Sequence, residues 1–270
     1  DVQYNTSAFE VSKRDTTVKF DFDPSKTYSY KGEAYNFTAL ELGNPAFSDT
    51  AEGVTFQAYS DVNRVTAVQA LNAGTYYAGA VSDTLSANYN VTGITDTNGE
   101  AWETFTIDRA TVTLSNTGIT NATYSGDSIS YDPSLITINY GGVPGLADEI
   151  DALKAALSYA YNGSSSAPVN AGTYNVTVSL PQQQNFNAAS LTISGGLVIG
   201  QLAITIEPDG GATVTVEYNG EMIPDLTYTV TANGEPIEEQ LEITTKYYKD
   251  SVEAGNITSD LRNVGTYIIV

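Results

Sequence analysis

The side chains in this sequence that could do chemistry are mostly carboxylates, because its 270 residues include 32 Asp and Glu but no His and no Cys. A Ser-His-Asp triad, a thiol nucleophile, a disulfide and the usual thiolate or imidazole zinc site are therefore excluded. Two carboxylate pairs, Asp21/Asp23 and Glu238/Glu239, could serve as the acid and base of a glycosidase. Nothing in their sequence surroundings separates them from an acidic surface, so we expect no catalytic residue and no cofactor.

Two acidic segments have features of a calcium site. Residues 96–100, Asp-Thr-Asn-Gly-Glu, alternate oxygen ligands around a glycine, but they lack the distal Glu of an EF-hand loop. Asp148, Glu149 and Asp151 lie close together where a helix is expected to begin. A hairpin turn and the acidic first turn of a helix are the better interpretations. We therefore expect no metal site.

Aromatic side chains offer another way to bind a ligand, because sugars stack on them. The chain has a single Trp, Trp102, and 19 Tyr. Several of the tyrosines recur in the motifs described below, and recurring tyrosines are more often core or corner residues. Binding of a host glycan, mucin or protein is kept as an alternative, which an exposed aromatic patch on one unit would favour.

The charge and composition narrow the class of protein further. Eleven Lys and Arg against 32 Asp and Glu give a net charge of −21, which argues against binding a nucleic-acid backbone. No apolar run approaches the roughly 18 residues of a transmembrane helix, so no membrane insertion is expected. The abundance of Thr, Ser, Asn, Gly, Tyr and Val predicts a mostly β fold. Long bacterial surface proteins often lack Cys, so its absence favours an extracellular, cell-surface location. The alternative is a cytosolic acidic protein that happens to lack Cys and His.

Two short motifs recur along the chain at similar intervals. The first is Tyr-x-Gly, whose two glycine-to-glycine intervals are both 94 residues. The second is Gly-Thr-Tyr, whose intervals are 98 and 93 residues. Two interleaved series in register predict a tandem array of three units of about 94 residues. The residues of the two series are Tyr30, Gly32, Gly74 and Tyr76, then Tyr124, Gly126, Gly172 and Tyr174, then Tyr218, Gly220, Gly265 and Tyr267.

Alternating strands are predicted around these motifs. Each unit opens with a strand before Tyr-x-Gly, and another follows Gly-Thr-Tyr. An Asn-aromatic-Asn element, at 88–90 and 185–187, then precedes a closing strand. The glycines of both motifs are expected to take a positive φ. An amphipathic helix is predicted at 146–161, as a lid over the sheet. The opening strands are expected at 18–22, 110–114 and 202–206, and the closing strands at 105–107 and 191–193.

The order of these motifs resembles the MBG ("mostly beta, glycine-rich") repeats of bacterial cell-surface adhesins. The resemblance covers nearly the whole chain and is strongest over Asn170–Val178, which reads Asn-Ala-Gly-Thr-Tyr-Asn-Val-Thr-Val. It implies Ig-like or β-grasp-like stalk modules with neighbouring repeats of the same protein as partners, and it carries over no catalytic residue. This chain departs from the pattern in the length of its units and in the helix inserted in the second.

The expected organisation is residues 15–109 as the first unit, 110–200 as the second and 201–270 as the third. The third unit ends at its Gly-Thr-Tyr strand and lacks a closing strand. Residues 1–14 resemble the closing strand of a preceding unit, because Phe9-Glu10-Val11 matches Phe105-Thr106-Ile107. Either the chain is cut from a longer array, or residues 1–14 donate a strand, through Phe9 and Val11, to the third unit of another copy.

These patterns favour a non-catalytic stalk or spacer module of a secreted cell-surface adhesin. The first alternative is a subunit of an extracellular filament that is assembled head to tail by strand donation between copies. The second alternative is a carbohydrate- or mucin-binding repeat.

Overall fold

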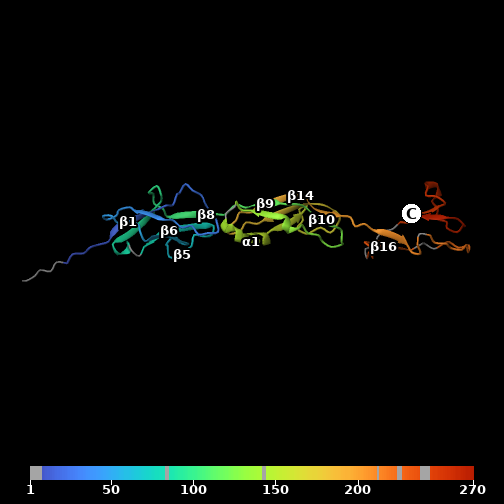
Figure 1. The fold of residues 1–270 in the computed structure, drawn as a ribbon, viewed down its shortest axis with the longest axis horizontal. Coiled ribbons are helices and arrows are strands. Elements are labelled where there is room, and N and C mark those ends of the chain that lie inside the picture. Colours follow the sequence, from blue (N-terminus) through green and yellow to red (C-terminus); the bar gives the residue numbers. More distant parts are fainter. Residues whose placement is uncertain (1–7, 83–84, 142–143, 212, 224–226, 238–243) are drawn as a thin grey trace, which may run out of the picture. The chain divides into compact units, whose positions relative to one another are not determined.

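A computed structural model describes residues 8–82, 85–141, 144–211, 213–223, 227–237 and 244–270 (Figure 1). As the composition predicts, the fold is mostly β, with many short strands and one short α-helix among these residues. The chain forms two compact units, one made mainly by residues up to Val198 and one mainly by Ile199–Val270. Residues 15–109, 110–200 and 201–270 are called the first, second and third segments below, and the boundary between the first and second stays a prediction.

The first segment folds into two sheets, of strand order β3-β1-β7 and β2-β8-β6-β4-β5. An aromatic cluster joins the two sheets. The ring of Trp102 stacks on that of Phe22, which follows β1, with centroids 4.1 Å apart. It also stacks on the ring of Phe56 in β4, with centroids 5.5 Å apart. The strands are β1 (Arg14–Phe20), β2 (Tyr28–Ser29), β3 (Ala39–Leu42), β4 (Val54–Tyr59), β5 (Ala67–Val68), β6 (Gly74–Ser82), β7 (Tyr89–Thr95) and β8 (Thr104–Asp108).

Strand β1 shows how the sequence pattern builds this core. Thr16, Val18 and Phe20 alternate with more exposed residues and are buried, because successive side chains of a strand point to opposite faces. Lys19, on the other face, forms an ion pair of 3.0 Å with Glu41 of the neighbouring β3. The strand begins at Arg14, earlier than the predicted 18–22, and β8 contains the predicted closing strand.

The second segment also forms two sheets, of strand order β9-β11 and β10-β14-β13-β12. Val176, Val178 and Leu180 alternate along β13 and supply much of the core. Strand β9 covers only the end of the predicted strand at 110–114, whereas the predicted closing strand lies within β14. The strands are β9 (Thr113–Asn116), β10 (Thr120–Thr123), β11 (Ile136–Asn139), β12 (Ser158–Tyr161), β13 (Gly172–Leu180) and β14 (Ala189–Gly200).

The described residues of the third segment form a three-stranded sheet, β15-β16-β17, and a two-stranded sheet, β18-β19. Strand β15 starts inside the strand predicted at 202–206, and β19 begins at Tyr267 of the last Gly-Thr-Tyr motif. The strands are β15 (Thr205–Pro208), β16 (Tyr228–Ala232), β17 (Glu235–Pro236), β18 (Tyr247–Lys249) and β19 (Tyr267–Ile269).

The helix predicted at 146–161 is only partly right. A 3-10 turn, η3 (Pro144–Glu149), leads into α1 (Ile150–Ala155), and Leu146 and Leu153 are buried, as expected for a lid. The last four predicted residues instead form β12, because they pair antiparallel with β13 and bury Tyr161. Three shorter 3-10 turns are η1 (Leu85–Ala87), η2 (Pro133–Leu135) and η4 (Ala254–Asn256).

The glycines of the two motifs have different backbone conformations. Those of Tyr-x-Gly have φ values of 76°, 85° and 80°, as predicted for a left-handed turn position. In Gly-Thr-Tyr, Gly74 has a φ of 155° and Gly172 and Gly265 do not have a positive φ, so the prediction was wrong for those two. The reason is that this motif begins a strand, and Gly74 and Gly172 are already the first residues of β6 and β13.

Candidate functional site

A turn of the second segment packs on the two motif loops of the first segment. The side chain of Asn185 makes two hydrogen bonds there: its Oδ1 accepts from the backbone N–H of Ala73 at 2.9 Å, and its Nδ2 donates to Oδ1 of Asn72 at 3.0 Å. One amide thereby satisfies a backbone donor and a side-chain acceptor just before the Gly-Thr-Tyr strand. Because both functions of the amide are used, the contact fixes the position and the orientation of the turn.

The next residue of the turn, Phe186, packs on the Tyr-x-Gly loop. Its ring meets the ring of Tyr30 edge to face, with centroids 5.4 Å apart, and both rings are buried. The Tyr30 hydroxyl donates to Oε1 of Glu149 at 2.9 Å. Burial, with the neighbouring Glu149 carboxylate, raises the pKa of Tyr30 above its ordinary value. The tyrosine is therefore held protonated and serves as a hydrogen-bond donor.

Two glycines allow the backbones to approach closely at this contact. A Cβ added to Gly32 would collide with the backbone carbonyl of Gly145, and a Cβ added to Gly145 would collide with the carbonyl of Lys31. Gly32 is thus required twice, for its positive φ of 76° and for the space it leaves. These residues form what we call the junction: Tyr30, Gly32, Asn72, Ala73, Gly145, Glu149, Asn185 and Phe186.

The connection between the segments is tied to the same turn. The N–H of Ala110 donates to the carbonyl of Asn185 at 2.8 Å, and the N–H of Asn187 donates to the carbonyl of Ala110 at 3.0 Å. Arg109 adds a bond from its Nε to the carbonyl of Gln183 at 3.1 Å. The chain therefore leaves β8 and enters the second segment along a path held by backbone hydrogen bonds.

The third segment carries the same two motifs, and here residues of both motifs line a pocket of about 140 Å³. Tyr218, Val264 and Tyr267 are among its lining residues. In contrast to Tyr30, which is 5% exposed, Tyr218 is 70% exposed, and Val264 is 80% exposed. The added Cβ of Gly220 would meet no atom within 4 Å. The motif residues of this segment are thus presented at a surface.

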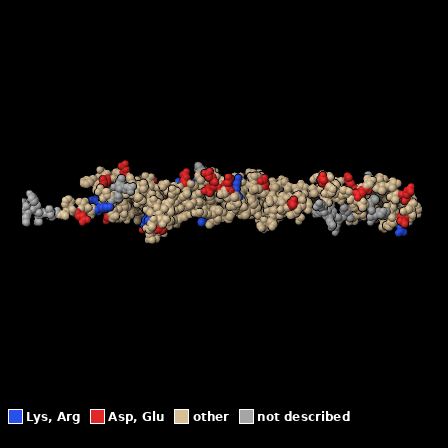
Figure 2. Space-filling model, turned by 90° about the horizontal axis from the view of Figure 1, so that it is seen from below, with Lys and Arg blue, Asp and Glu red and all other residues tan. Residues whose placement is uncertain are grey.

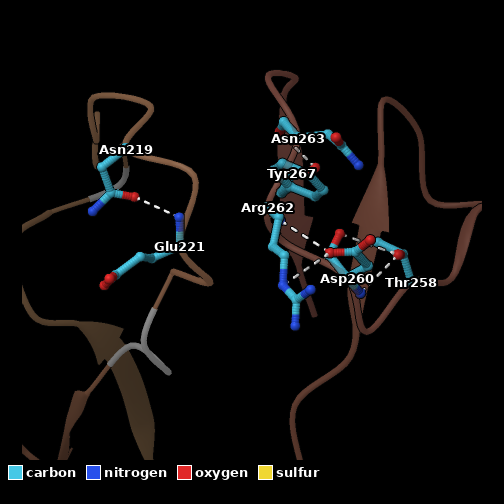
Figure 3. Close-up of polar contacts among 7 residues, drawn as sticks. All are labelled: Asn219, Glu221, Thr258, Asp260, Arg262, Asn263 and Tyr267. Atoms are coloured by element: carbon cyan, nitrogen blue, oxygen red, sulfur yellow. Dashed lines mark hydrogen bonds and ion pairs between the residues drawn. The ribbon is translucent and has the colours of Figure 1, made fainter.

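Local hydrogen bonds hold the two loops of this pocket (Figure 3). Oδ1 of Asn219 accepts from the N–H of Glu221 at 2.9 Å. On the other loop, the N–H of Arg262 donates to Oδ1 of Asp260 at 3.2 Å, and the N–H of Asp260 donates to Oγ1 of Thr258 at 3.0 Å. Turns closed by Asn, Asp and Thr side chains preorganise the backbone of both loops.

The tyrosine of Gly-Thr-Tyr makes the same hydrogen bond in two segments. The hydroxyl of Tyr76 donates to the carbonyl of Asn72 at 2.8 Å, and that of Tyr267 donates to the carbonyl of Asn263 at 2.8 Å. The bond closes the loop onto its own strand and occupies the asparagine carbonyl. In the first segment, the side chain of Asn72 and the next N–H then face the junction.

The structure brings together some of the residues that the sequence singles out. Tyr30, Gly32 and the residues just before Gly74 meet the second segment, whereas Tyr124 donates its N–H to the carbonyl of Gly200 at 2.9 Å. Gly126, Gly172 and Tyr174 lie in or beside strands β10 and β13. Four contact residues were not predicted as such: Asn185, Phe186, Gly145 and Glu149. The recurring Asn-aromatic-Asn element was a usable signal for the first two.

Three of the residues considered for catalysis and metal binding, Asp21, Asp23 and Asp96, have local structural roles. Asp96 is buried, and its Oδ1 accepts from the N–H groups of Asn98 and Glu100, so this loop is a hairpin turn. Asp21 and Asp23 accept backbone N–H bonds from Thr38 and Ser25. Glu238 and Glu239 lie outside the described residues. In the described part of the chain, no group of three or more Asp and Glu is placed to hold a metal ion.

The aromatic residue considered for sugar stacking is in the core. Trp102 is 4% exposed, surrounded by Phe rings, and its Nε1 donates to the carbonyl of Thr104 at 3.2 Å. Its faces are covered by Phe22 and Phe56, so they cannot receive a sugar ring. None of the helices in the described ranges has the length and apolar character that a bilayer crossing requires.

Two comparisons with known proteins were negative. No family model matches the chain, and no curated protein matches it significantly.

Proposed function

We propose that this chain is a structural, non-catalytic spacer built from tandem Ig-like or β-grasp-like units of about 94 residues, and that it forms part of the stalk of a secreted cell-surface adhesin. The observation that carries the proposal is the junction, in which one unit receives the Asn-aromatic-Asn turn of the next. The mechanism is mechanical: sheet hydrogen bonds resist extension, and the junction resists bending between units.

The matching strand orders support a tandem arrangement. In the sheets β2-β8-β6-β4 and β10-β14-β13-β12, the strand preceding Tyr-x-Gly lies beside the closing strand, which lies beside the Gly-Thr-Tyr strand. The entry into each segment also matches. Arg14 bridges Tyr89 in parallel, and Ala110 bridges Phe186 in parallel. Equivalent residues therefore make equivalent pairings in two segments with different cores.

The chemistry of the junction supports a load-bearing role. The position and orientation of the turn are constrained by three kinds of contact. These are the hydrogen bonds of the Asn185 side chain, an edge-to-face ring pair and a close approach of two glycines. A flexible tether would need none of these contacts, because a Gly- and Ser-rich linker suffices for it. The local structural roles of Asp21, Asp23 and Asp96 support a non-catalytic function.

Stretching single molecules of the full chain between two attachment points tests the proposal. Independent units of about 94 residues should unfold one at a time, each adding about 300 Å of contour length, since an extended residue spans about 3.3–3.6 Å. Equal steps of this size are expected for the first two segments. A single step for the whole chain, or extension without force peaks, would contradict a tandem spacer.

The proposed location has a separate test. Antibodies against the chain should label intact cells of the source organism as strongly as permeabilised cells. Labelling that requires permeabilisation would contradict a surface location without affecting the mechanical argument.

A further inference from the structure

The tripeptide Tyr-Asn-Gly occurs twice in the sequence, around Asn162 and around Asn219. An Asn that is followed by Gly can modify itself, because a glycine lets the next backbone nitrogen approach the Asn side chain closely. The second copy is the Tyr-x-Gly motif of the third segment, whereas the other two motifs have Lys31 and Ser125 at the middle position. Both asparagines are exposed, so access of water does not distinguish them. What distinguishes the two copies is their geometry.

The side chain of Asn219 is folded back toward the peptide bond that follows it (Figure 3). Its Oδ1 accepts a hydrogen bond from the N–H of Glu221, two residues further on, at 2.9 Å. This is an Asx turn, in which the side chain mimics a turn of the backbone. Because Oδ1 is held at the second N–H, the side-chain carbonyl carbon, Cγ, is carried toward the intervening nitrogen, which belongs to Gly220.

The nitrogen of Gly220 is well placed to attack that carbon. Among the residues that the structure describes, its N–H donates no hydrogen bond. Gly220 has a φ of 80°, and a Cβ added to it would meet no atom within 4 Å. The N–H of Glu221 polarises the Asn219 carbonyl and would stabilise the negative charge that develops on Oδ1 during the attack. The loop therefore supplies an oriented electrophile, an unbonded nitrogen and a donor for the oxyanion.

We propose that Asn219 is a self-modifying site, which converts to Asp and isoAsp without an enzyme. The Gly220 nitrogen bonds to Cγ, and the side-chain amide nitrogen leaves as ammonia together with the proton that the Gly220 nitrogen gives up. The product is a cyclic imide, which water opens at one carbonyl to give Asp or at the other to give isoAsp. The site does not depend on the proposed spacer function, since its chemistry uses one loop of the third segment.

The other three Asn-Gly pairs of the sequence lack this arrangement. Oδ1 of Asn162 accepts from the N–H of Asn175 at 2.9 Å, which holds its side chain toward β13. The N–H of Gly99 donates to the carbonyl of Asp96 at 3.0 Å, so the nitrogen that would have to attack is already bonded. Asn233, in the turn between β16 and β17, makes no Asx bond with any described residue. We therefore expect these three pairs to react more slowly in the native chain.

The conversion changes the loop that carries it. It adds a negative charge to a chain whose net charge is already −21, and Figure 2 shows acidic residues along the face in view with few basic ones among them. The isoAsp product also routes the main chain through the side-chain carbon, which lengthens the backbone between Tyr218 and Gly220. The Tyr-x-Gly turn of the third segment therefore changes with the age of the protein, and the equivalent turns at Lys31 and Ser125 do not.

Peptide mapping by mass spectrometry tests the inference, with the full chain incubated in heavy-oxygen water at mildly alkaline pH. Asp and isoAsp should accumulate at Asn219 at least about tenfold faster than at Asn162, because only Asn219 is held in an attacking geometry. Each product should carry a heavy oxygen atom taken from water. In denaturant, where the fold is lost, the two Tyr-Asn-Gly copies should react at similar rates.

Two variants at Glu221 separate the effect of the turn from that of the sequence. Glu221→Pro removes the N–H that bonds Oδ1 and should slow the reaction at Asn219 at least about fivefold. Glu221→Gln keeps this N–H and is the matched control, so the rate should be unchanged. Equal rates at Asn219 and Asn162 in the native chain would overturn the inference. So would a preference for Asn219 that persists in denaturant, or a Glu221→Pro chain that reacts as fast as the parent.

Discussion

The motif loops of the first and third segments have the same residue types and different surroundings. In the first segment, Asn185 and Phe186 cover them and Tyr30 is 5% exposed, whereas Tyr218 of the third segment is 70% exposed. The Tyr-x-Gly turn itself is unchanged, with φ values of 76° at Gly32 and 80° at Gly220. The turn therefore forms with or without a neighbour, and the packing of Phe186 on Tyr30 is what distinguishes the first segment from the third.

The largest difference in the free energy of unfolding is expected between replacements of the two Tyr-x-Gly glycines, Gly32 and Gly220. Gly32→Val should destabilise the first compact unit by about 3 kcal/mol or more, because it combines a strained positive φ with a collision against Gly145. Gly220→Val carries only the backbone strain and should cost about 1 kcal/mol. Both free-energy changes can be measured by denaturant unfolding of the full chain, monitored with probes specific to each segment. Equal costs would mean that the close approach at Gly32 contributes nothing.

A smaller difference is expected between the two asparagines of the Asn-aromatic-Asn elements. Asn185→Ala should cost about 2 kcal/mol, since it removes two hydrogen bonds and leaves the part-buried N–H of Ala73 without its acceptor. Asn88→Ala changes an exposed side chain and should lie within about 0.5 kcal/mol of the parent at protein concentrations where the chain is monomeric. If the two substitutions prove indistinguishable in unfolding experiments, the amide contact is not what holds the junction.

A smaller difference in the free energy of unfolding is expected between substitutions of the two Gly-Thr-Tyr tyrosines, Tyr76 and Tyr267. Tyr76→Phe removes a part-buried hydrogen bond to Asn72 and should cost about 1 kcal/mol. Tyr267→Phe removes the equivalent bond at an exposed site, where water competes, and should cost about half of that or less. Thermal unfolding of the two variants decides the order, and a larger loss at Tyr267 would reverse the comparison.

The smallest expected effect is a pH dependence of the first compact unit. The pKa of Tyr30 is raised by burial and by Glu149, and burial also raises the pKa values of Tyr76 and Tyr131. The unfolded chain therefore releases these protons first, so stability is full below about pH 10 and falls as pH rises through the higher folded values. Tyr30→Phe should make this alkaline fall less steep in unfolding experiments at graded pH. An unchanged slope would show that Tyr30 is not protected from ionisation.

The sequence predicts the repeated parts of the fold better than the parts that differ. Alternation identified β8 and β13, and the Tyr-x-Gly glycines take the expected φ because a tight turn leaves few alternatives to glycine. The helix at 146–161 was overextended, because Ser158–Tyr161 fits a helical stripe by spacing but gains a strand partner in β13. Pairing with a distant strand cannot be read from local periodicity.

The candidate site was only half predictable for the same reason. Tyr30 and Gly32 were singled out by their recurrence, yet their recurrence was explained by the turn alone. The role of Gly32 in the close approach depends on Gly145, more than 100 residues away, and no local pattern connects the two. Asn185 was part of a recognised element, but its two hydrogen bonds depend on the placement of the Asn72-Ala73 loop.

Residue-resolved amide hydrogen exchange of the full chain, at a concentration where it is monomeric, tests the central claim that these loops receive a neighbouring unit. The N–H of Ala73, bonded to Asn185, should exchange at least about tenfold more slowly than that of Val264, and Asn185→Ala should abolish the difference. Equal exchange at Ala73 and Val264 in the parent chain, or protection of Ala73 that survives Asn185→Ala, would contradict the account.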